Sequence, residues 1–231
     1  MKKIIRFLLD FVLILCIAAI VILGVKICER MDDDKSLDQT YQEIRKNRKN
    51  RQIDWKRLKE INPDIVGWVY VKGTNIDYPV VKGKSNREYL HKTFRKKYAY
   101  GGCIFIDSNC DINSSQNVIV YGHHMRNGSM FADLVKFRST SFAKKHAIYF
   151  FTPQKCYQLN AFSAYAQKEI PSFPIEFVHP DQFEAFKQKV SSSSDIEAEY
   201  PKEAKKIFTF ITCSYEANDY RTYVHAAEIG K

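Results

Sequence analysis

An unbroken apolar run lies near the start of the chain. Phe7 to Val25 consists almost entirely of Leu, Ile, Val, Phe and Ala, interrupted only by Asp10 and two small residues. At a helical rise of about 1.5 Å per residue, such a run spans the hydrocarbon core of a bilayer. It is longer than the usual apolar region of a cleaved signal peptide, and no small-x-small cleavage site ends it. We therefore expect residues 7–27 to form an uncleaved transmembrane signal anchor.

The charges around this run indicate its orientation. Three basic residues precede it, and basic residues before a span keep the N-terminus in the cytoplasm, although Lys26 and Arg30 after the span reduce the asymmetry. We expect residues 1–6 to be cytoplasmic and the rest of a single-pass cell-membrane protein to be extracellular.

A polar, basic segment follows the anchor. Between Ser36 and Ile61 the apolar side chains recur at irregular, near-helical intervals, which predicts one or two amphipathic helices. We expect residues 28–61 to form a helical stalk packed on the following domain. Asn62-Pro63-Asp64 is a stop signal for a helix, and after it the periodicity changes.

Residues 62–231 carry a β pattern. Most of the short runs rich in Val, Ile, Phe and Tyr are separated by Gly, Asn, Asp or Pro. These runs are Trp68 to Val71, Ile76 to Val81, Cys103 to Ile106, Val118 to Tyr121, Ala147 to Phe151, Cys156 to Tyr165, Ile207 to Thr212 and Tyr223 to Ile229. Eight runs without regular intervening helices predict a mainly β domain, with one mostly antiparallel sheet system closed into a barrel or folded as a sandwich. Two helical insertions are expected, at Met130 to Phe137 and, before the penultimate strand, at Asp181 to Val190.

Size and charge limit the classes of function. The 231 residues are 45% hydrophobic and 14% aromatic, which suits one catalytic-size domain with an appendage. The net charge of +10 suits nucleic acid, a phospholipid surface or an acidic cell-wall polymer. The basic residues are spread along the chain or gathered near the apolar run, with no zinc-finger spacing or RNP-like string, so we expect no nucleic-acid partner.

The cysteines divide into two groups. Cys16 and Cys28 lie in or beside the span, and lipid attachment at Cys16 is disfavoured because Leu15 stands where lipoprotein cleavage boxes carry a small residue. The other four show neither the density nor the paired spacing of a disulfide framework or a zinc site; they are Cys103, Cys110, Cys156 and Cys213. We expect most of them to be small, buried thiols, and only Cys213 to require another explanation.

Cys213 ends a strand. The β-branched and aromatic run Thr209 to Thr212 delivers it to a polar loop, where a thiol is held by the sheet and is open to solvent. A nucleophile requires this placement, although a single cysteine at such a position is more often a buried residue of an edge strand.

A second strand ends in Gly122, followed by His123 and His124. Glycine lets the backbone turn sharply and leaves the next side chain uncovered. An imidazole near a thiol can take its proton and later protonate a leaving amine. Surface polarity is the ordinary explanation of such a pair, and zinc is disfavoured because no third ligand stands at suitable spacing. We expect no metal and no cofactor.

Arg221 follows Cys213 by eight residues and opens the last strand. If the two strands are hairpin neighbours, the guanidinium returns close to the thiol, where it can donate to the oxyanion of a tetrahedral intermediate or hold a substrate backbone. A solvated charge is the alternative.

Together these motifs resemble the sortase family, and within it class B. Thr209 to Cys213 is similar to the family's Thr-Leu-x-Thr-Cys signature, Tyr121 to His124 resembles its histidine loop, and Arg221 stands where its arginine follows the cysteine. Gly67 to Val81, Asn86 to Leu90, the N-terminal helices and the insertion at Asp181 to Val190 also resemble class B. The likeness covers roughly Ser36 to the C-terminus.

The resemblance implies a closed eight-stranded sortase-type barrel and a cysteine transpeptidase. Cys213 would attack the Thr carbonyl of a surface protein's C-terminal sorting signal, and an amino group of a peptidoglycan precursor or cross-bridge would resolve the thioester. By the same likeness His123, rather than His124, is the catalytic imidazole. The residues expected to bind substrate are Asn86, Leu90, Ile211, Thr212 and Ser214.

Some positions depart from the family pattern. Phe210 replaces the usual Leu, and Ile211 stands where a close class B relative has a hydroxyl, which bears on the preferred pentapeptide. Two other functions compete: an extracellular cysteine hydrolase that uses the same Cys-His pair with water as acceptor, and an anchored β-barrel binding module without catalysis. The remaining histidines, His91, His146, His179 and His225, are expected to be structural.

Overall fold

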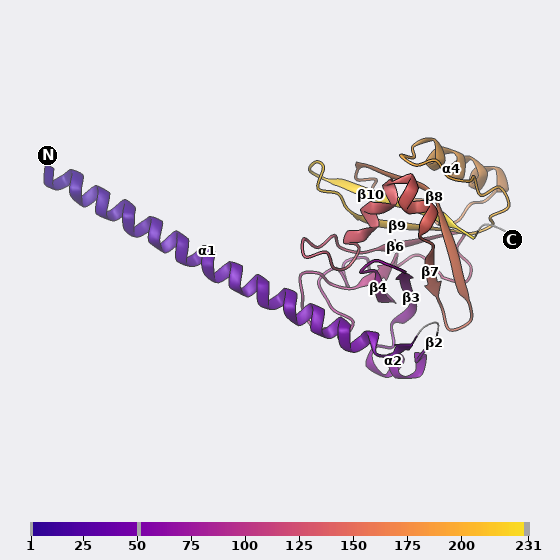
Figure 1. Ribbon diagram of the computed structural model, residues 1–231, viewed down its shortest axis with the longest axis horizontal. Coiled ribbons are helices and arrows are strands. Elements are labelled where there is room, and N and C mark those ends of the chain that lie inside the picture. Colours follow the sequence, from indigo (N-terminus) through magenta and orange to yellow (C-terminus); the bar gives the residue numbers. More distant parts are fainter. Residues whose placement is uncertain (1, 50–51, 229–231) are drawn as a thin grey trace.

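A long helix, α1 (Lys2–Arg45), leads into a closed β-barrel in the computed structural model, which describes residues 2–49 and 52–228 (Figure 1). Around the barrel the strands run in the order β10-β8-β7-β3-β4-β5-β6-β9. Their bounds are β3 (Ile65–Val71), β4 (Asp77–Lys82), β5 (Ile104–Ile106), β6 (Asn117–Tyr121), β7 (Ile148–Phe151), β8 (Cys156–Lys168), β9 (Ile207–Cys213) and β10 (Tyr220–Ala227). The expected eight-stranded barrel is confirmed. Ile229, where the sequence pattern ends the last strand, lies outside the described residues.

Two strand pairings in the barrel are parallel. β4 pairs with β5 and β6 pairs with β9 in parallel, whereas the other neighbouring strands described are antiparallel. Because β6 and β9 run in the same direction, their C-terminal ends meet at one rim of the barrel. The segments that follow them, beginning at Gly122 and Ser214, therefore start side by side.

Aromatic side chains fill the barrel. Phe150, Phe208 and Phe210 are all fully buried, and the rings of Phe150 and Phe208 lie 5.0 Å apart. Phe208 and Phe210 alternate along β9 with Thr209 and Ile211, as the two-residue period of a strand requires. One face of β9 thus packs the interior, and the other carries Thr209, Ile211 and Cys213.

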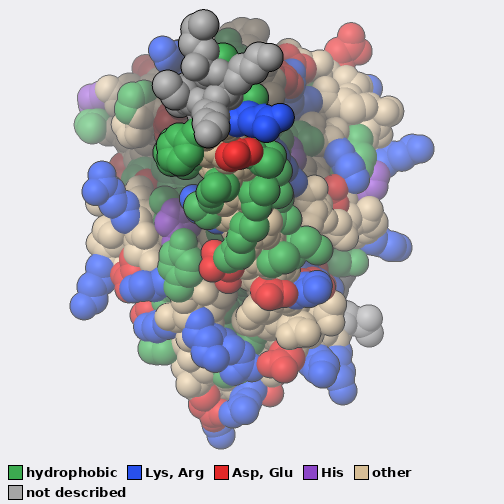
Figure 2. Space-filling view, turned by 90° about the vertical axis from the view of Figure 1, so that its left-hand side faces the viewer, with side chains coloured by type: hydrophobic (Ala, Val, Ile, Leu, Met, Phe, Trp, Pro, Cys, Tyr) green, Lys and Arg blue, Asp and Glu red, His purple; other side chains and the backbone are tan. Residues whose placement is uncertain are grey.

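Helix α1 continues from the apolar run into the domain without a break, where the sequence predicts a span and a separate stalk helix. Its apolar N-terminal part is exposed and is long and apolar enough to cross a membrane (Figure 2). Its C-terminal part packs on the barrel through buried Leu37, Tyr41 and Ile44. The Tyr41 hydroxyl donates a hydrogen bond to the Gly102 carbonyl at 2.7 Å.

A short hairpin joins α1 to the second helix. β1 (Arg48–Lys49) pairs with β2 (Gln52–Ile53), and α2 (Trp55–Ile61) follows, with the Asp54 carboxylate capping its N-terminus. The sequence pattern predicts helix across this whole segment, so the hairpin is a correction.

The insertions differ in detail from the expected helices. The first is a 3₁₀ helix, η1 (Ala132–Arg138), followed by α3 (Thr140–Lys145), which the sequence pattern does not predict. Met130, the expected first residue, has φ of +58°, and this left-handed conformation prevents a right-handed helix from starting there. The second insertion is α4 (Pro180–Ser192), close to its expected bounds.

Candidate active site

Cys213 and Arg221 occupy opposite positions of the antiparallel pair β9 and β10. Directly opposite residues project from the same face of a sheet, with β-carbons about 5 Å apart. Cys213 is partly exposed, unlike the buried Cys103 and Cys110. Cys156 is also exposed, which corrects the expectation that it is buried.

His123 reaches the same place from the parallel neighbour. Tyr121 lies opposite Ile211, and the Gly122 amide donates to the Ile211 carbonyl at 3.1 Å, which extends the pairing by one step. Continuing the register places His123 beside Cys213. The barrel thus brings the three sequence-predicted residues His123, Cys213 and Arg221 to one rim.

Gly122 is required by close packing. A β-carbon there would lie 2.6 Å from Cδ2 of Phe131 and would also overlap Cδ1 of Ile104. Only a residue without a side chain lets the backbone pass this close and turn His123 outward.

The His123 ring is held by the backbone. Its Nε2 lies 2.9 Å from the Leu90 carbonyl oxygen, and because a carbonyl only accepts, Nε2 carries the hydrogen. In the neutral ring Nδ1 is then the basic nitrogen.

The surroundings of His123 lower its pKa. Burial is the main cause, and the positive charges of His91 and Arg221 add to it, whereas the hydrogen bond to Leu90 acts in the opposite direction. The imidazole is therefore neutral at pH 7.

Two further rings flank His123. His91 stacks on it with ring centroids 5.5 Å apart, and Tyr100 stacks at 5.8 Å. His91 Nδ1 in turn donates to the Tyr100 carbonyl at 3.1 Å. His91 therefore belongs to the site, although sequence reasoning assigns it a structural role. The one sequence feature that could have indicated this is that His91 directly follows Leu90, an expected substrate-binding residue.

His124 is engaged differently. Its Nδ1 donates to the Cys213 carbonyl at 3.0 Å, and its ring packs on Tyr215 with centroids 4.5 Å apart. The Tyr215 hydroxyl donates to the His124 carbonyl. His124 thereby ties the loop after β6 to the loop after β9.

Arg221 keeps part of its hydrogen-bonding capacity free for other partners. Its Nη1 donates to the Tyr220 carbonyl and its Nη2 to Glu169, both at 3.2 Å. A guanidinium has five N–H donors. The side chain is one quarter exposed, so a ligand at the rim can reach the others.

The expected substrate-binding residues on β9 divide by face. Ile211 projects on the same side as Cys213, but Thr212 projects into the barrel interior and is buried. Ser214 is also buried; its amide donates to the Tyr220 carbonyl at 2.8 Å, which closes the turn between the strands. The Thr212 and Ser214 side chains are therefore buried beneath the rim, and the Ser214 backbone closes the turn.

The other two expected residues lie in the segment between β4 and β5. Leu90 contributes the carbonyl that holds His123. Asn86 donates to the Asp107 carboxylate at 2.7 Å and accepts from the Ser108 amide at 2.8 Å. Both polar ends of Asn86 thus brace the loop that carries Leu90.

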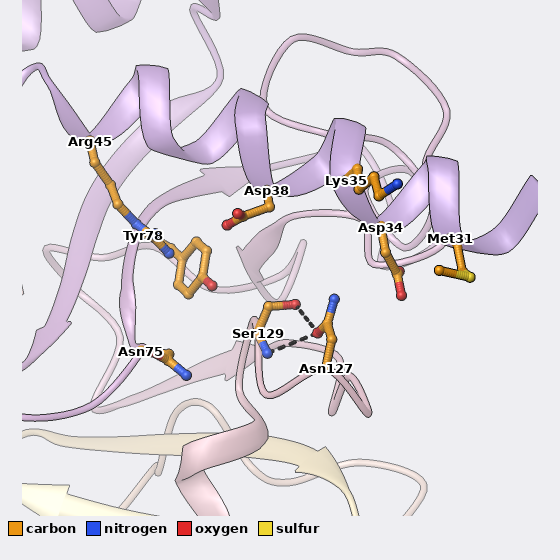
Figure 3. Close-up of a pocket in the computed structure, with 9 residues that line it drawn as sticks. All are labelled: Met31, Asp34, Lys35, Asp38, Arg45, Asn75, Tyr78, Asn127 and Ser129. Carbon is orange, nitrogen blue, oxygen red and sulfur yellow. Dashed lines mark hydrogen bonds between the residues drawn. The ribbon is translucent and has the colours of Figure 1, made fainter.

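A separate cavity of about 480 Å³ lies between α1 and the barrel (Figure 3). Asp34 and Asp38 of α1 face Asn75, Tyr78 and the Asn127–Ser129 turn across it. None of the catalytic candidates lines it. Among residues 2–49 and 52–228, no group of three or more His, Cys, Asp or Glu side chains is arranged to hold a metal ion.

A partly exposed thiol, a neutral imidazole and a guanidinium at the rim of a closed barrel describe a cysteine-dependent acyl-transfer enzyme. Comparison with known proteins gives the family. The model of the sortase domain matches residues 69–229. Sortase B of Staphylococcus aureus is 31% identical over 217 residues, covering 89% of each chain.

Solved structures agree with this match. Clostridium perfringens sortase B superposes with a TM-score of 0.70 at 35% identity, covering 76% of this chain and 99% of that one. A Staphylococcus aureus sortase B-substrate complex superposes with a TM-score of 0.75 at 29% identity, covering 84% and 97%. The chain belongs to the sortase family of cysteine transpeptidases, and its relatives are class B sortases.

Proposed function

We propose that the protein cleaves the C-terminal sorting signal of surface proteins after Thr, through a thioester on Cys213, and transfers the acyl group to an amino group of peptidoglycan. The observation that carries this proposal is the register that sets Arg221 opposite Cys213, with His123 two residues after the end of β6 on the other side of β9. The similarity to a sortase B-substrate complex supports the binding of a sorting-signal peptide.

In the first half-reaction, Nδ1 of neutral His123 accepts the Cys213 proton as Sγ attacks the Thr carbonyl. Arg221 donates to the oxyanion of the tetrahedral intermediate. His123 then gives the proton to the leaving amine as the C–N bond breaks, and the thioester remains. One proton thus moves from thiol to amine.

The second half-reaction reverses these roles. An incoming amine attacks the thioester carbonyl, His123 accepts its proton, and the thiolate leaves and is reprotonated. A peptidoglycan precursor or cross-bridge supplies this amine. The Leu90 carbonyl keeps His123 in the tautomer that both steps require.

The apolar part of α1 supports a location for this chemistry. We infer that residues 7–27 span the cell membrane, with residues 1–6 cytoplasmic and the catalytic domain outside. The sortase family is associated with the cell surface, which agrees with this topology.

The test is thioester capture. Full-length protein in detergent is incubated with a sorting-type peptide carrying a quencher, with and without oligoglycine or diaminopimelate, and the products are identified by mass spectrometry. We expect an acyl adduct on Cys213 and amine-dependent transfer product. Cys213→Ala and His123→Ala should each abolish turnover and retain the wild-type circular dichroism spectrum.

Two results would contradict the proposal. If the wild-type protein at saturating amine cleaves the peptide at an unchanged rate and yields only the hydrolysis product, the protein is a hydrolase. Peptide binding without an adduct would indicate a binding module.

A further inference from the structure

Helix α1 sets the height of the active site above the membrane. Arg30 follows Val25, the last residue of the apolar run, by five residues on one continuous helix. At a rise of about 1.5 Å per residue it lies about 7.5 Å beyond Val25 along the helix axis. The headgroup layer on each side of a bilayer is about 5–8 Å thick, so Arg30 lies at its level.

Arg30 contacts the active-site rim directly. Its guanidinium lies over the Tyr100 ring, 4.9 Å from the centroid, and Tyr100 stacks on His123 at 5.8 Å. Tyr100 is exposed. These two successive contacts bring the catalytic histidine close to the level of Arg30.

A second Arg-Tyr pair contacts His124, the residue after His123. Arg126 lies over the Tyr215 ring at 5.9 Å, and Tyr215 packs on His124. Burial raises the pKa of Tyr215, and the charges of Arg126 and Arg30 act in the opposite direction. Arg30, Tyr100, Arg126 and Tyr215, which we name the rim cluster, thus gather around the site.

The chemistry of the rim cluster suits a lipid interface. Tyr rings concentrate at the boundary between hydrocarbon and water, and Arg side chains there bind headgroup phosphates. All four side chains are exposed. Figure 2 views this end of the molecule with α1 directed at the viewer, and both basic and acidic side chains lie around the helix.

Neighbouring charges decide which feature of the lipid is recognised. Exposed Glu29, Asp32 and Asp33 lie on α1 beside Arg30 and offset its charge. The surface is therefore not a strongly cationic patch for one acidic lipid. The headgroup phosphate that all phospholipids share is the chemistry that fits it.

We propose that the rim cluster is a lipid-facing surface that seats the mouth of the active site in the outer headgroup layer of the membrane that holds α1. This inference rests on the proposed anchoring by residues 7–27.

Depth-dependent fluorescence quenching tests this surface. Tyr215→Trp and Val178→Trp are prepared in the full-length chain and reconstituted into phosphatidylcholine vesicles containing lipid with a nitroxide on the headgroup. Val178 is 84% exposed and precedes α4, which lies on the side of the barrel away from α1 (Figure 1). The unsubstituted protein contains only the native Trp55 and Trp68, and its fluorescence is subtracted from that of each variant.

We expect nitroxide to quench Trp at position 215 at least threefold more than Trp at position 178. Adding Arg30→Gln and Arg126→Gln to Tyr215→Trp should reduce this difference by half or more. Lys144→Gln with Lys145→Gln, two exposed charges on α3, is the matched control and should leave it unchanged.

Equal quenching at the two positions would overturn the inference, as would extraction of the reconstituted protein by alkaline carbonate. Turnover of a soluble sorting-type peptide by the reconstituted unsubstituted protein reports the proposed chemistry independently. If that protein cleaves peptide and the two Trp positions are quenched equally, the lipid-facing surface alone is rejected. If quenching is unequal and the unsubstituted protein shows no turnover, the chemistry alone is rejected.

Discussion

Arg221 lies directly opposite Cys213 across β9 and β10, on the same face of the sheet. The pairing is part of a ladder that continues to Ala227 opposite Ile207, so the relative position of the two side chains is set by the barrel and not by the intervening loop. A residue held this way changes its position little when a substrate binds. This favours a preorganised donor for an oxyanion.

Arg221→Ala should lower kcat/KM for a sorting-type peptide by about a hundredfold or more, the usual loss for an oxyanion donor. Arg221→Lys should recover little, because a lysine lacks the planar fork of donors. Steady-state kinetics of the purified variants measures both.

Glu169→Gln is the matched control for this pair of variants. It removes the ion pair to Arg221 but keeps the guanidinium, and it should change kcat/KM by less than about threefold because an exposed ion pair contributes little. Full activity in Arg221→Ala would remove the proposed role.

The pKa of His123 is lowered from its ordinary value, so the neutral base persists below pH 6.5. The acidic limb of kcat/KM should therefore fall at a pH below 6.5. His91→Gln removes a charge that lowers this pKa, so the limb should move to higher pH. Nitrogen-15 NMR of the imidazoles measures the titration and should show Nε2–H as the neutral tautomer.

The exposed His179 offers a control for this titration. His179→Gln should change neither the pH of the acidic limb of kcat/KM nor the titration of the His123 resonance. An unchanged His123 titration in His91→Gln would contradict the electrostatic contact between the two rings.

Gly122→Ala should lower activity at least tenfold and destabilise the fold by about 1–3 kcal/mol, because its methyl group overlaps Phe131 and Ile104 and forces a backbone shift at His123. Thermal unfolding and peptide kinetics measure the two effects. Gly24→Ala, where a β-carbon meets nothing within 4 Å, should alter neither. Wild-type kinetics in Gly122→Ala would show that the close approach does not position His123.

His225 is fully buried between Thr209 and Tyr165, and burial lowers its pKa to about 3. The unfolded chain binds a proton near pH 6.5 that the folded chain does not, so this group makes the free energy of unfolding fall as pH decreases from about 6.5 toward 3. Urea unfolding at several pH values measures this slope.

His225→Gln should flatten that slope and lower stability at pH 7 by about 1–3 kcal/mol, since the new side chain leaves a buried partner unsatisfied. His179→Gln should leave the slope unchanged. An unchanged slope in His225→Gln would assign the acid sensitivity to other groups.

The strands of the barrel could be predicted from the sequence because their residues are β-branched and aromatic and turn residues separate most of them. The parallel pairing of β6 with β9 could not, because long segments separate these strands and pairing direction leaves no local pattern. The start of η1 was misplaced because the left-handed conformation of Met130 is set by a tertiary contact, in which its amide donates to the Tyr78 hydroxyl at 2.9 Å.

At the site, the three expected catalytic residues carry recognisable motifs, but their surroundings do not. His91 lies 32 positions before His123, and only the folded loop stacks the two rings. Thr212 is expected to bind substrate, yet the two-residue period of a strand turns its side chain to the face opposite Cys213. A long separation in sequence likewise concealed the contact of His91 with His123.

The hydrogen bond between the Leu90 carbonyl and His123 gives the segment between β4 and β5 a second role. In the proposed reaction, the segment that is expected to bind the incoming peptide also fixes which nitrogen of His123 is available as the base. A poorly fitting peptide that displaces this segment would also weaken the hydrogen bond that holds His123. Discrimination among peptides would therefore appear in kcat as well as in binding affinity.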